Sequence, residues 1–430
     1  MQNRIRGILK SEFFRNVATL MTGSTIAQII ALAIYPILTD LYSPDDFGLF
    51  SLYMGIIAIT GIISTGRYQL AILMPKTDKQ AVQLSALGLF IAVSVSLILL
   101  MVVVLFRHGI AQTFNNPNIE KWLWFVPLST FMIAFFQVSI YWHNRQKRFR
   151  TTAAANLSQS ISNSAIKLST SKNFLSGGGL ITGAIIGQVI GAVYFLISWI
   201  SRFRVMLGKV NLQGMKEEGV RYYRFPGFNL PNNLVNNLSN SLPIFLISAY
   251  FGSAELGLYS LGFTMIFRPM NLITNSMEQV FSQRVIKKFN DGVSIRRDVF
   301  TLMKRTVQIA ILPFALVGVF GPLIFSKVFG AEWEMSGRFM QLLIPWFFVA
   351  FIANQLTFIP DLLSKQKTAF IINLVRLILR LVGMAVGIYL DNIMLTLGLF
   401  SLASFTMVVV TIIWYVRLIR QSVPRVNNDY

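Results

Sequence analysis

LSALGLFIAVSVSLILLMVVVLF, residues 84–106, is an apolar stretch without a single charged side chain. An α-helix rises about 1.5 Å per residue, so this stretch is long enough to cross the hydrocarbon layer of a bilayer, which is about 30 Å thick. A second stretch of the same kind, MLTLGLFSLASFTMVVVTIIWYV, covers residues 394–416. Both stretches predict transmembrane helices, and together they argue against a water-soluble fold.

The composition of the whole chain supports the same interpretation. Hydrophobic residues make up 54% of the 430 positions, charged residues make up 13%, and the mean hydropathy is +0.60. A soluble domain carries charge on roughly a quarter of its positions. A chain with half that fraction of charged residues cannot cover the surface of a soluble protein of this size. The bilayer must therefore be the main solvent of this protein.

Apolar segments recur from one end of the chain to the other and predict an all-α integral membrane protein with about twelve transmembrane helices. We expect these helices at residues 14–41, 47–74, 80–106, 121–143, 151–173, 178–201, 228–251, 256–286, 298–325, 338–362, 368–390 and 393–417. The segment 151–173 is polar, but the charge pattern of the flanking loops requires it to cross. A polar helix in a bundle can line a water-filled cavity without contacting lipid.

The formal net charge is +21, which in a soluble protein would indicate a nucleic-acid partner. Here the cations cluster in alternate loops, so we expect no nucleic-acid partner and interpret the charge as a topology signal. The basic loops contain Arg4, Arg6, Lys10, Arg15, Lys76, Lys79, Arg145, Lys147, Arg148, Arg150, Arg202, Arg204, Lys209, Lys216, Arg221, Arg224, Lys287, Lys288, Arg296, Arg297, Lys365, Lys367, Arg417, Arg420 and Arg425. The positive-inside rule then places both termini in the cytoplasm.

The longest basic loop, residues 203–225, separates two halves that resemble each other. DFGLFSLY at 46–53 aligns with ELGLYSLG at 255–262, 209 positions later, and each copy opens the second helix of its half. We therefore predict an N-terminal six-helix lobe (1–202), a cytoplasmic linker (203–225) and a C-terminal six-helix lobe (226–430) around a central cavity. This is the arrangement of an alternating-access transporter. Chance similarity over eight residues is the alternative.

Cations within the predicted helices form the first group of candidate site residues. A charged side chain at bilayer depth costs a few kcal/mol or more, so each calls for an explanation. The candidate ligands for an anion, pyrophosphate in particular, are Arg67, Lys167, Arg268, Arg376 and Arg380. Guanidinium suits phosphate because its planar fork binds two oxygens at once. Glu278 is the clearest counter-charge. Alternatively, Arg67 and Arg376 lie near helix ends and extend to the headgroups.

Amide side chains near residue 230 form the second group. Asn229, Asn233, Asn236 and Asn240 recur at four- and three-residue spacing and so share one helix face. Amides donate and accept hydrogen bonds simultaneously, which matches sugar hydroxyls. This stripe is therefore a candidate glycan-facing surface. Hydrogen bonding between helices is the alternative explanation.

The sequence contains no catalytic constellation, which favours transport over an enzyme. No Ser/His/Asp set, phosphate-binding glycine–lysine loop or pair of intramembrane carboxylates is present. The chain has no cysteine, and its two histidines, His108 and His143, lie in different predicted loops, so we expect no metal centre and no cofactor.

Several stretches then resemble a known family: SPDDFGLFSLYMGIIAIT (43–60), STGRYQLAILMPKTDKQA (64–81), and the run from FPGFNLPNNL to LGFTM (225–265) with SMEQVFSQR (276–284). They are similar to the Wzx-type O-antigen flippases, which belong to the polysaccharide exporter family of the multidrug/oligosaccharidyl-lipid/polysaccharide superfamily. The resemblance covers nearly the whole chain and implies a MATE-like fold. One position departs from the family pattern, because Gln69 stands where members commonly have glutamate beside the arginine that corresponds to Arg67.

The resemblance implies export of an undecaprenyl-pyrophosphate-linked repeat unit across the bacterial inner membrane, for O-antigen or capsule synthesis. The partners implied are this lipid-linked oligosaccharide and membrane lipids, with a polysaccharide polymerase and a chain-length regulator as further candidates. A multidrug or small-cation exporter of the same fold is the alternative, and the positive interior disfavours it. A non-transporting membrane scaffold for polysaccharide assembly is a third hypothesis, and it leaves the cations unexplained.

Overall fold

The computed structural model describes residues 25–170, 178–207 and 210–421, and within them every regular element is helical. The chain forms two compact units, Met1–Gly257 and Leu258–Tyr430. The N-terminal part of the first predicted helix and both termini lie outside the described residues. The division into six-helix lobes at residues 203–225 stays a prediction.

Seven helices among the described residues are long and apolar enough to cross a membrane. They are α4 (Pro44–Ile63), α5 (Asp78–Thr113), α9 (Gly178–Leu207), α13 (Arg296–Phe329), α14 (Glu334–Ala353) with its flanking short helices, α16 (Gln366–Tyr389) and α17 (Ile393–Gln421). The other long helical segments are Thr25–Leu41, which ends as α3 (Tyr35–Leu41), and α7 (Val126–Arg145), α8 (Phe149–Ser169), α11 (Leu230–Phe251) and α12 (Ser253–Asn290).

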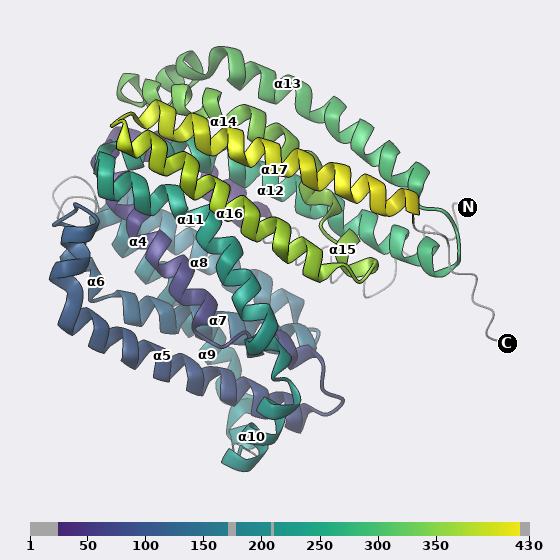
Figure 1. Ribbon diagram of the computed structural model, residues 1–430. Coiled ribbons are helices and arrows are strands. Elements are labelled where there is room, and N and C mark those ends of the chain that lie inside the picture. The colour runs from purple at the N-terminus through teal and green to yellow at the C-terminus, as the bar shows by residue number, and fades with distance from the viewer. Residues whose placement is uncertain (1–24, 171–177, 208–209, 422–430) are drawn as a thin grey trace. The chain divides into compact units, whose positions relative to one another are not determined.

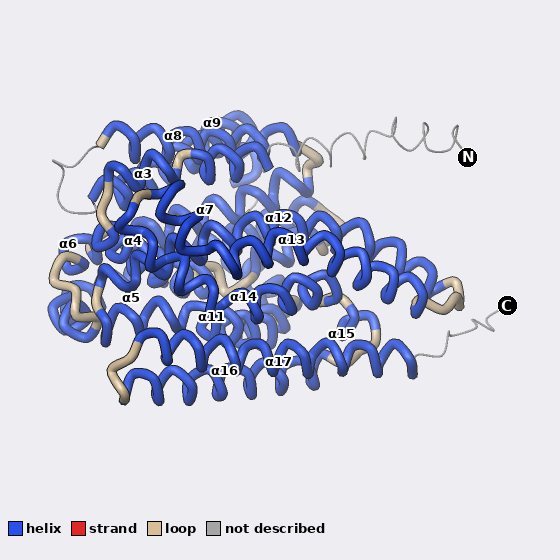
Figure 2. Tube along the Cα trace, turned by 90° about the horizontal axis from the view of Figure 1, so that it is seen from above, coloured by secondary structure: helices blue, strands red, loops and turns tan. Residues whose placement is uncertain are grey.

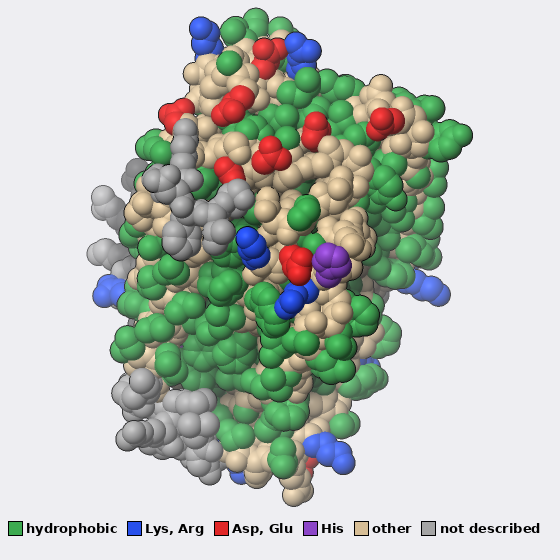
Figure 3. All heavy atoms as spheres, turned by 90° about the vertical axis from the view of Figure 1, so that its left-hand side faces the viewer, with side chains coloured by type: hydrophobic (Ala, Val, Ile, Leu, Met, Phe, Trp, Pro, Cys, Tyr) green, Lys and Arg blue, Asp and Glu red, His purple; other side chains and the backbone are tan. Residues whose placement is uncertain are grey.

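These segments fall at the twelve predicted positions, and the prediction of an all-α, multi-pass membrane protein is confirmed. The polar segment after residue 150 is the helix α8, which packs along α9. Hydrophobic side chains cover much of the visible surface in Figure 3. On α5, for example, Leu97, Ile98 and Met101 are 61%, 62% and 65% exposed, as expected of a helix whose outer face contacts lipid.

In the second unit, long helices pack as neighbours along their length. α16 lies beside α17, and α14 packs against both α13 and α17 (Figures 1 and 2). The largest fully buried side chains of this unit include Trp333, Phe339, Phe347 and Phe400, each exposed by no more than 1%. Phe400 of this aromatic core contacts Arg380 of α16, which is described below.

The second predicted helix ends earlier than expected. We predicted helix through residue 74, but α4 ends at Ile63, and a separate 3₁₀ helix, η1, covers Tyr68–Leu73. The cause is the turn between them, where Gly66 has φ +57° and Arg67 has φ +66°. A left-handed residue cannot continue a right-handed helix, and for a side chain other than glycine this conformation costs roughly 1–3 kcal/mol. Arg67 therefore lies in a helix break.

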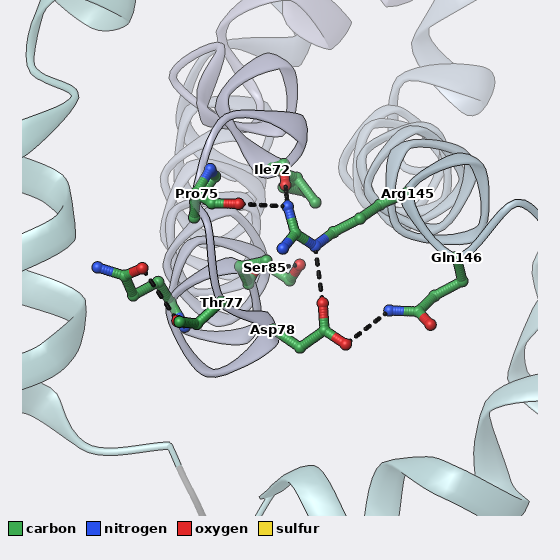
Figure 4. Close-up of polar contacts among 9 residues, drawn as sticks. Ile72, Pro75, Thr77, Asp78, Ser85, Arg145 and Gln146 are labelled. Atoms are coloured by element: carbon green, nitrogen blue, oxygen red, sulfur yellow. Dashed lines mark hydrogen bonds and ion pairs between the residues drawn. The ribbon is translucent and has the colours of Figure 1, made fainter.

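Arg145, at the end of α7, holds the far end of η1 in place (Figure 4). Its Nη1 donates hydrogen bonds to the carbonyl oxygens of Ile72, at 3.2 Å, and Pro75, at 2.8 Å. Its Nε is 2.9 Å from the Asp78 carboxylate, which also accepts a hydrogen bond from Gln146 at 3.2 Å. One guanidinium thus joins α7 to the turn between η1 and α5.

Replacing Arg145 with methionine should lower the thermal stability of the purified protein. The change leaves two carbonyls and a carboxylate without their donor, and charge-assisted hydrogen bonds of this kind contribute about 2 kcal/mol each. The measurement is the unfolding midpoint in detergent, with Arg150→Met as the matched control because Arg150 is exposed and makes no described contact. Equal midpoints for the two variants would contradict the proposed clamp.

Close backbone packing joins the two copies of the internal repeat. A Cβ atom placed on Gly48 would lie 1.8 Å from the carbonyl oxygen of Ser253, and one placed on Gly257 would lie 1.8 Å from the carbonyl oxygen of Pro44. These contacts are reciprocal, because Pro44 and Ser253 are 209 positions apart, as are Gly48 and Gly257. We call this contact the glycine crossing. Only glycine allows the two backbones to approach so closely.

The predicted linker, residues 203–225, contains a helix that we did not predict. α10 covers Leu212–Arg221 and is capped by Asn211, whose side chain accepts a hydrogen bond from the Gly214 backbone N–H at 2.6 Å. It packs against α5 (Figure 1). The segment is too short and too polar to be recognised from its hydropathy.

Candidate functional site

Two unusual backbone segments meet at a hydrogen bond between side chains. Arg67 lies in the left-handed turn after α4, and Asn229 ends a short π-helical turn, η2 (Phe225–Asn229), that leads into α11. The Nε atom of Arg67 donates to the Oδ1 atom of Asn229 at 2.9 Å. Strained and π-helical backbone is found preferentially at functional sites, so this contact is the strongest local indication of one. We call it the Arg67–Asn229 pair.

The Arg67–Asn229 pair leaves most of the guanidinium available. Arg67 is half-buried, and the described residues provide neither a carboxylate nor a hydrogen-bond acceptor for its two Nη atoms. Tyr141 of α7 is near enough to interact with it electrostatically. The geometry therefore presents the fork of a fixed guanidinium without a protein anion bound to it, as required for binding an anionic ligand.

The amide stripe of α11 continues from this pair. The Nδ2 atom of Asn233 donates to the backbone oxygen of Asn229 at 2.9 Å and to its Oδ1 atom at 3.1 Å. One turn further, Asn236 is half-buried and makes no described hydrogen bond, and Asn240 is exposed. α11 packs along α4. The first two amides of the stripe thus belong to the same hydrogen-bonded group as Arg67, and the glycan-facing role of the stripe stays a prediction.

Gln69, the departure from the family pattern, does not interact with Arg67. Its side chain is 1% exposed, accepts a hydrogen bond from the Thr65 hydroxyl, and donates one to Gln137 of α7 at 3.0 Å. The side chain at position 69 therefore helps to fix the turn against α7. The absence of a carboxylate here leaves Arg67 without an adjacent acidic partner in the sequence.

Lys167 lies elsewhere in the first unit. Its side chain is 6% exposed, with Nζ 4.2 Å from the centre of the Phe50 ring and its stem packed against Gly183. Phe50 is near the start of α4, and Arg67 follows the end of this helix at Ile63. Because the helix rises about 1.5 Å per residue, Lys167 and Arg67 are separated by about 20 Å or more along α4. The structure does not bring these two cations together.

Arg376 and Arg380 share one face of α16 in the second unit. Arg380 is 1% exposed, and its guanidinium is 4.9 Å from the Trp346 ring centre and 4.8 Å from that of Phe400. Its Nε also donates to Ser404 at 2.8 Å. Arg376 donates to Thr411 of α17 at 3.1 Å, and its Nε is buried with no described partner. Both arginines lie within the packing of α16 against its neighbours.

Arg268 and Glu278 both lie on α12 and have different surroundings. Arg268 is exposed and makes no described hydrogen bond or ion pair. Glu278 is half-buried and accepts a hydrogen bond from Thr357 at 2.5 Å. Among the described ion pairs, Glu278 is not matched with any predicted cation, and its role as a counter-charge stays a prediction.

Sequence reasoning missed several residues that shape the Arg67–Asn229 pair. Tyr141 and Gln137 come from α7, whose pattern showed only an apolar helix, and Arg145 was predicted only as a basic loop residue. The glycine directly before Arg67 was the one available signal, because Gly followed by a polar residue is typical of a turn. The contacts themselves depend on how α7 packs, which no local pattern specifies.

Comparison with known proteins agrees with this fold. The chain resembles a solved inward-facing multidrug resistance MATE family transporter of the MOP superfamily, with a TM-score of 0.69 and 12% identity, covering 94% of this chain and 96% of that one. It also resembles the lipid II flippase MurJ in an inward closed conformation, with a TM-score of 0.70 and 14% identity, covering 92% of this chain and 87% of that one. At these identities the likeness shows the fold alone.

A MOP superfamily transporter from Pyrococcus furiosus matches with a TM-score of 0.59 and 11% identity over 95% of both chains. In sequence, the chain is 22% identical over 120 residues to the amylovoran biosynthesis protein AmsL of Erwinia amylovora. That match spans 27% of this chain and 30% of the relative.

A family comparison covers a much larger part of the sequence. Residues 37–337 match the profile of a family described as polysaccharide biosynthesis protein. The matched region begins in the helical segment before α4 and ends within α14, so it includes both copies of the internal repeat and the Arg67–Asn229 pair. The chain therefore belongs to this polysaccharide biosynthesis protein family and has the membrane fold that MATE transporters share with MurJ.

Proposed function

We propose that this protein is a flippase that moves an undecaprenyl-pyrophosphate-linked oligosaccharide repeat unit across the bacterial inner membrane. It would act by alternating access, have both termini in the cytoplasm, and supply O-antigen or capsule synthesis. The family supports a role in polysaccharide synthesis, and the fold is that of membrane transporters and of a lipid II flippase. A lipid-linked sugar is the substrate class that fits both the polysaccharide family and the likeness to a lipid flippase.

The Arg67–Asn229 pair is the observation that carries this proposal. It places a guanidinium with unoccupied Nη donors next to a row of amides that begins with Asn229 and Asn233. A pyrophosphate-linked sugar presents the complementary groups in the same order, because the anionic phosphates join directly to a hydroxyl-rich ring. Guanidinium binds phosphate through two parallel hydrogen bonds, and amides satisfy hydroxyls as donors and acceptors.

Accessibility distinguishes the five candidate cations. Lys167 and Arg380 are buried against aromatic rings, and Arg376 is bound to Thr411. No described side chain accepts a hydrogen bond from the Nη atoms of Arg67 or from Arg268, and we propose each of these arginines as a candidate for a direct phosphate contact. The buried cations would contribute positive potential, which a low-dielectric interior transmits farther than water does.

The alternative function is export of multidrug or small-cation substrates, which the likeness to a MATE transporter favours. Deleting the gene and restoring it on a plasmid separates the two functions. A flippase deletion should lose surface polysaccharide and accumulate lipid-linked repeat units in the inner membrane, while resistance to cationic dyes stays unchanged. Loss of dye resistance with normal polysaccharide would establish the exporter instead.

Replacing Arg268 with alanine should reduce surface polysaccharide about tenfold or more, because one bidentate phosphate contact is worth at least 1.4 kcal/mol or so. Arg268 is exposed and makes no described contact, so the amount of protein in the membrane and its unfolding midpoint should not change. Arg338→Ala, which removes an arginine paired with Glu334 on α14, is the control. A normal amount of surface polysaccharide in the Arg268 variant would show that Arg268 does not contact the phosphate.

A further inference from the structure

α10 has two faces of opposite character, and its inner face is bound to the protein by polar contacts. Gln80 of α5 donates from Nε2 to Glu218 at 3.0 Å, and the Asn211 backbone N–H donates to Gln83 at 3.3 Å. The hydroxyl of Tyr68 donates to the carbonyl oxygen of Gly219 at 3.0 Å. These contacts hold α10 against the first turns of α5 and against the beginning of η1.

The outer face of α10 consists of Leu212, Lys216 and Val220. These residues follow each other at four-residue spacing and therefore share one side of the helix. Leu212 is 79% exposed and Val220 is 65% exposed, and Lys216 is exposed between them. Tyr223, just after the helix, is 56% exposed. Aliphatic side chains on either side of a lysine are typical of helices that lie in a membrane interface.

The position of α10 along α5 matches the level of that interface. It contacts Gln80 and Gln83, and Gly219 lies close to Leu87. The uncharged apolar stretch of α5 begins at Leu84, so these contacts fall where α5 enters the hydrocarbon layer. The outer face of α10 is thus at the depth of lipid headgroups, where an apolar side chain can insert while an ammonium group reaches phosphate.

We propose that α10 is an amphipathic interfacial helix whose outer face binds the headgroup layer of an anionic phospholipid leaflet. Charge supports a lipid surface as the occupant. Lys216 lies in the middle of the outer face and Arg224 follows the helix, so two cations are available to lipid phosphates. The carboxylate of Glu217 borders Val220 at the edge of this face and accepts a hydrogen bond from Gln213 at 3.0 Å, whereas Glu218 is turned inward to Gln80 and Arg221.

Lipid binding at the outer face would act on the candidate site through Tyr68. This residue starts η1 directly after Arg67 and is hydrogen-bonded to α10. A helix fixed to the leaflet therefore restrains the turn that holds Arg67. The inference concerns α10 itself and does not depend on which substrate is transported.

Single-cysteine labelling tests the proposal in the full chain, because the protein contains no cysteine of its own. Leu212→Cys, Val220→Cys and the control Arg221→Cys are each labelled with bimane and reconstituted into nanodiscs rich in phosphatidylglycerol. Arg221 is the matched control because it is an exposed position of the same helix, on the side opposite Leu212. Bimane at 212 and 220 should be quenched by headgroup-level doxyl lipids and should be about threefold or more less accessible to aqueous iodide than bimane at 221.

A second set of variants tests the role of charge. Adding Lys216→Glu to the Val220→Cys protein should restore iodide access in anionic nanodiscs, because it places a carboxylate among phosphates. Equal iodide access at 212, 220 and 221 in anionic nanodiscs would overturn the proposal. So would protection at 220 that persists in lipid-free amphipol, or that appears only when another protein co-purifies, because the face would then be covered by protein.

Discussion

Replacing Arg67 with glycine should abolish surface polysaccharide while the protein remains folded and inserted in the membrane. The substitution removes the guanidinium, which under the proposed function would make two or three charge-assisted hydrogen bonds to phosphate, each worth about 1.5 kcal/mol or more. A combined loss of about 3 kcal/mol corresponds to roughly a hundredfold lower transport rate. The assay is surface polysaccharide in a deletion strain that expresses the variant.

Glycine is the informative replacement because Arg67 has φ +66°. Glycine adopts this left-handed conformation without strain, and this gain offsets the lost hydrogen bond to Asn229, so the variant should keep the unfolding midpoint of the native protein. Lost transport at an unchanged midpoint then has no structural cause. Arg67→Lys should retain partial activity, because it preserves the charge but loses the planar fork and the bond to Asn229. Arg150→Gly, at an exposed cation on α8, serves as the control for charge alone.

Normal polysaccharide in the Arg67→Gly strain would remove the Arg67–Asn229 pair from the mechanism. A loss of polysaccharide accompanied by a lower unfolding midpoint would instead give Arg67 a structural role. Asn229→Ala separates these cases further, because it removes the acceptor of Arg67 Nε while leaving the guanidinium in place. We expect it to weaken transport less than the loss of Arg67 itself.

Gly48→Ala should produce a large loss of stability for the addition of a single methyl group. The new Cβ would lie 1.8 Å from the Ser253 carbonyl oxygen, and the clashing atom belongs to backbone that cannot rotate away. Overpacking of this kind costs about 3 kcal/mol or more, because two helices must separate. Gly257→Ala should behave in the same way, since its Cβ would lie 1.8 Å from the carbonyl oxygen of Pro44.

Gly109→Ala is the matched control for the glycine crossing. Gly109 lies in α5, and a Cβ atom at this position meets nothing within 4 Å. Alanine should therefore raise the unfolding midpoint slightly, because it favours helix over glycine by up to about 1 kcal/mol. Unfolding midpoints that are the same for Gly48→Ala and Gly109→Ala would show that the two backbones do not pack as the structure describes.

The prediction of the fold succeeded where the signal was local and strong. The stretch at 84–106 and its counterpart at 394–416 correspond to α5 and α17, and the polar segment after residue 150 was placed correctly as a helix by the charges on either side of it. Helix ends were less well predicted. The turn at Gly66 and Arg67 interrupts an otherwise apolar run, and hydropathy averaged over a window does not register two residues with positive φ.

The candidate site shows the same limit more clearly. The residue types were found, because an arginine or an asparagine stripe within apolar sequence is visible by itself. Which of these residues lie together in the fold was not predicted. Arg67 joins Asn229 through side chains 162 positions apart, whereas Lys167 is held by Phe50 at the other end of α4. Sequence spacing places residues on a helix face but does not say which neighbouring helix that face meets.

The sequence by itself determined that this chain is a helical membrane protein, because the free energy of transferring an apolar segment into lipid is a sum over neighbouring residues. It also determined that cations and amides occur within the membrane-spanning part. Only the tertiary structure decided that Arg67 meets the amides in a break between helices, that Arg380 is buried between Trp346 and Phe400, and that α10 lies against α5. These outcomes depend on contacts between segments that are distant in the sequence. Side-chain packing determines such contacts, and the hydropathy averaged over a window of neighbouring residues carries no information about it.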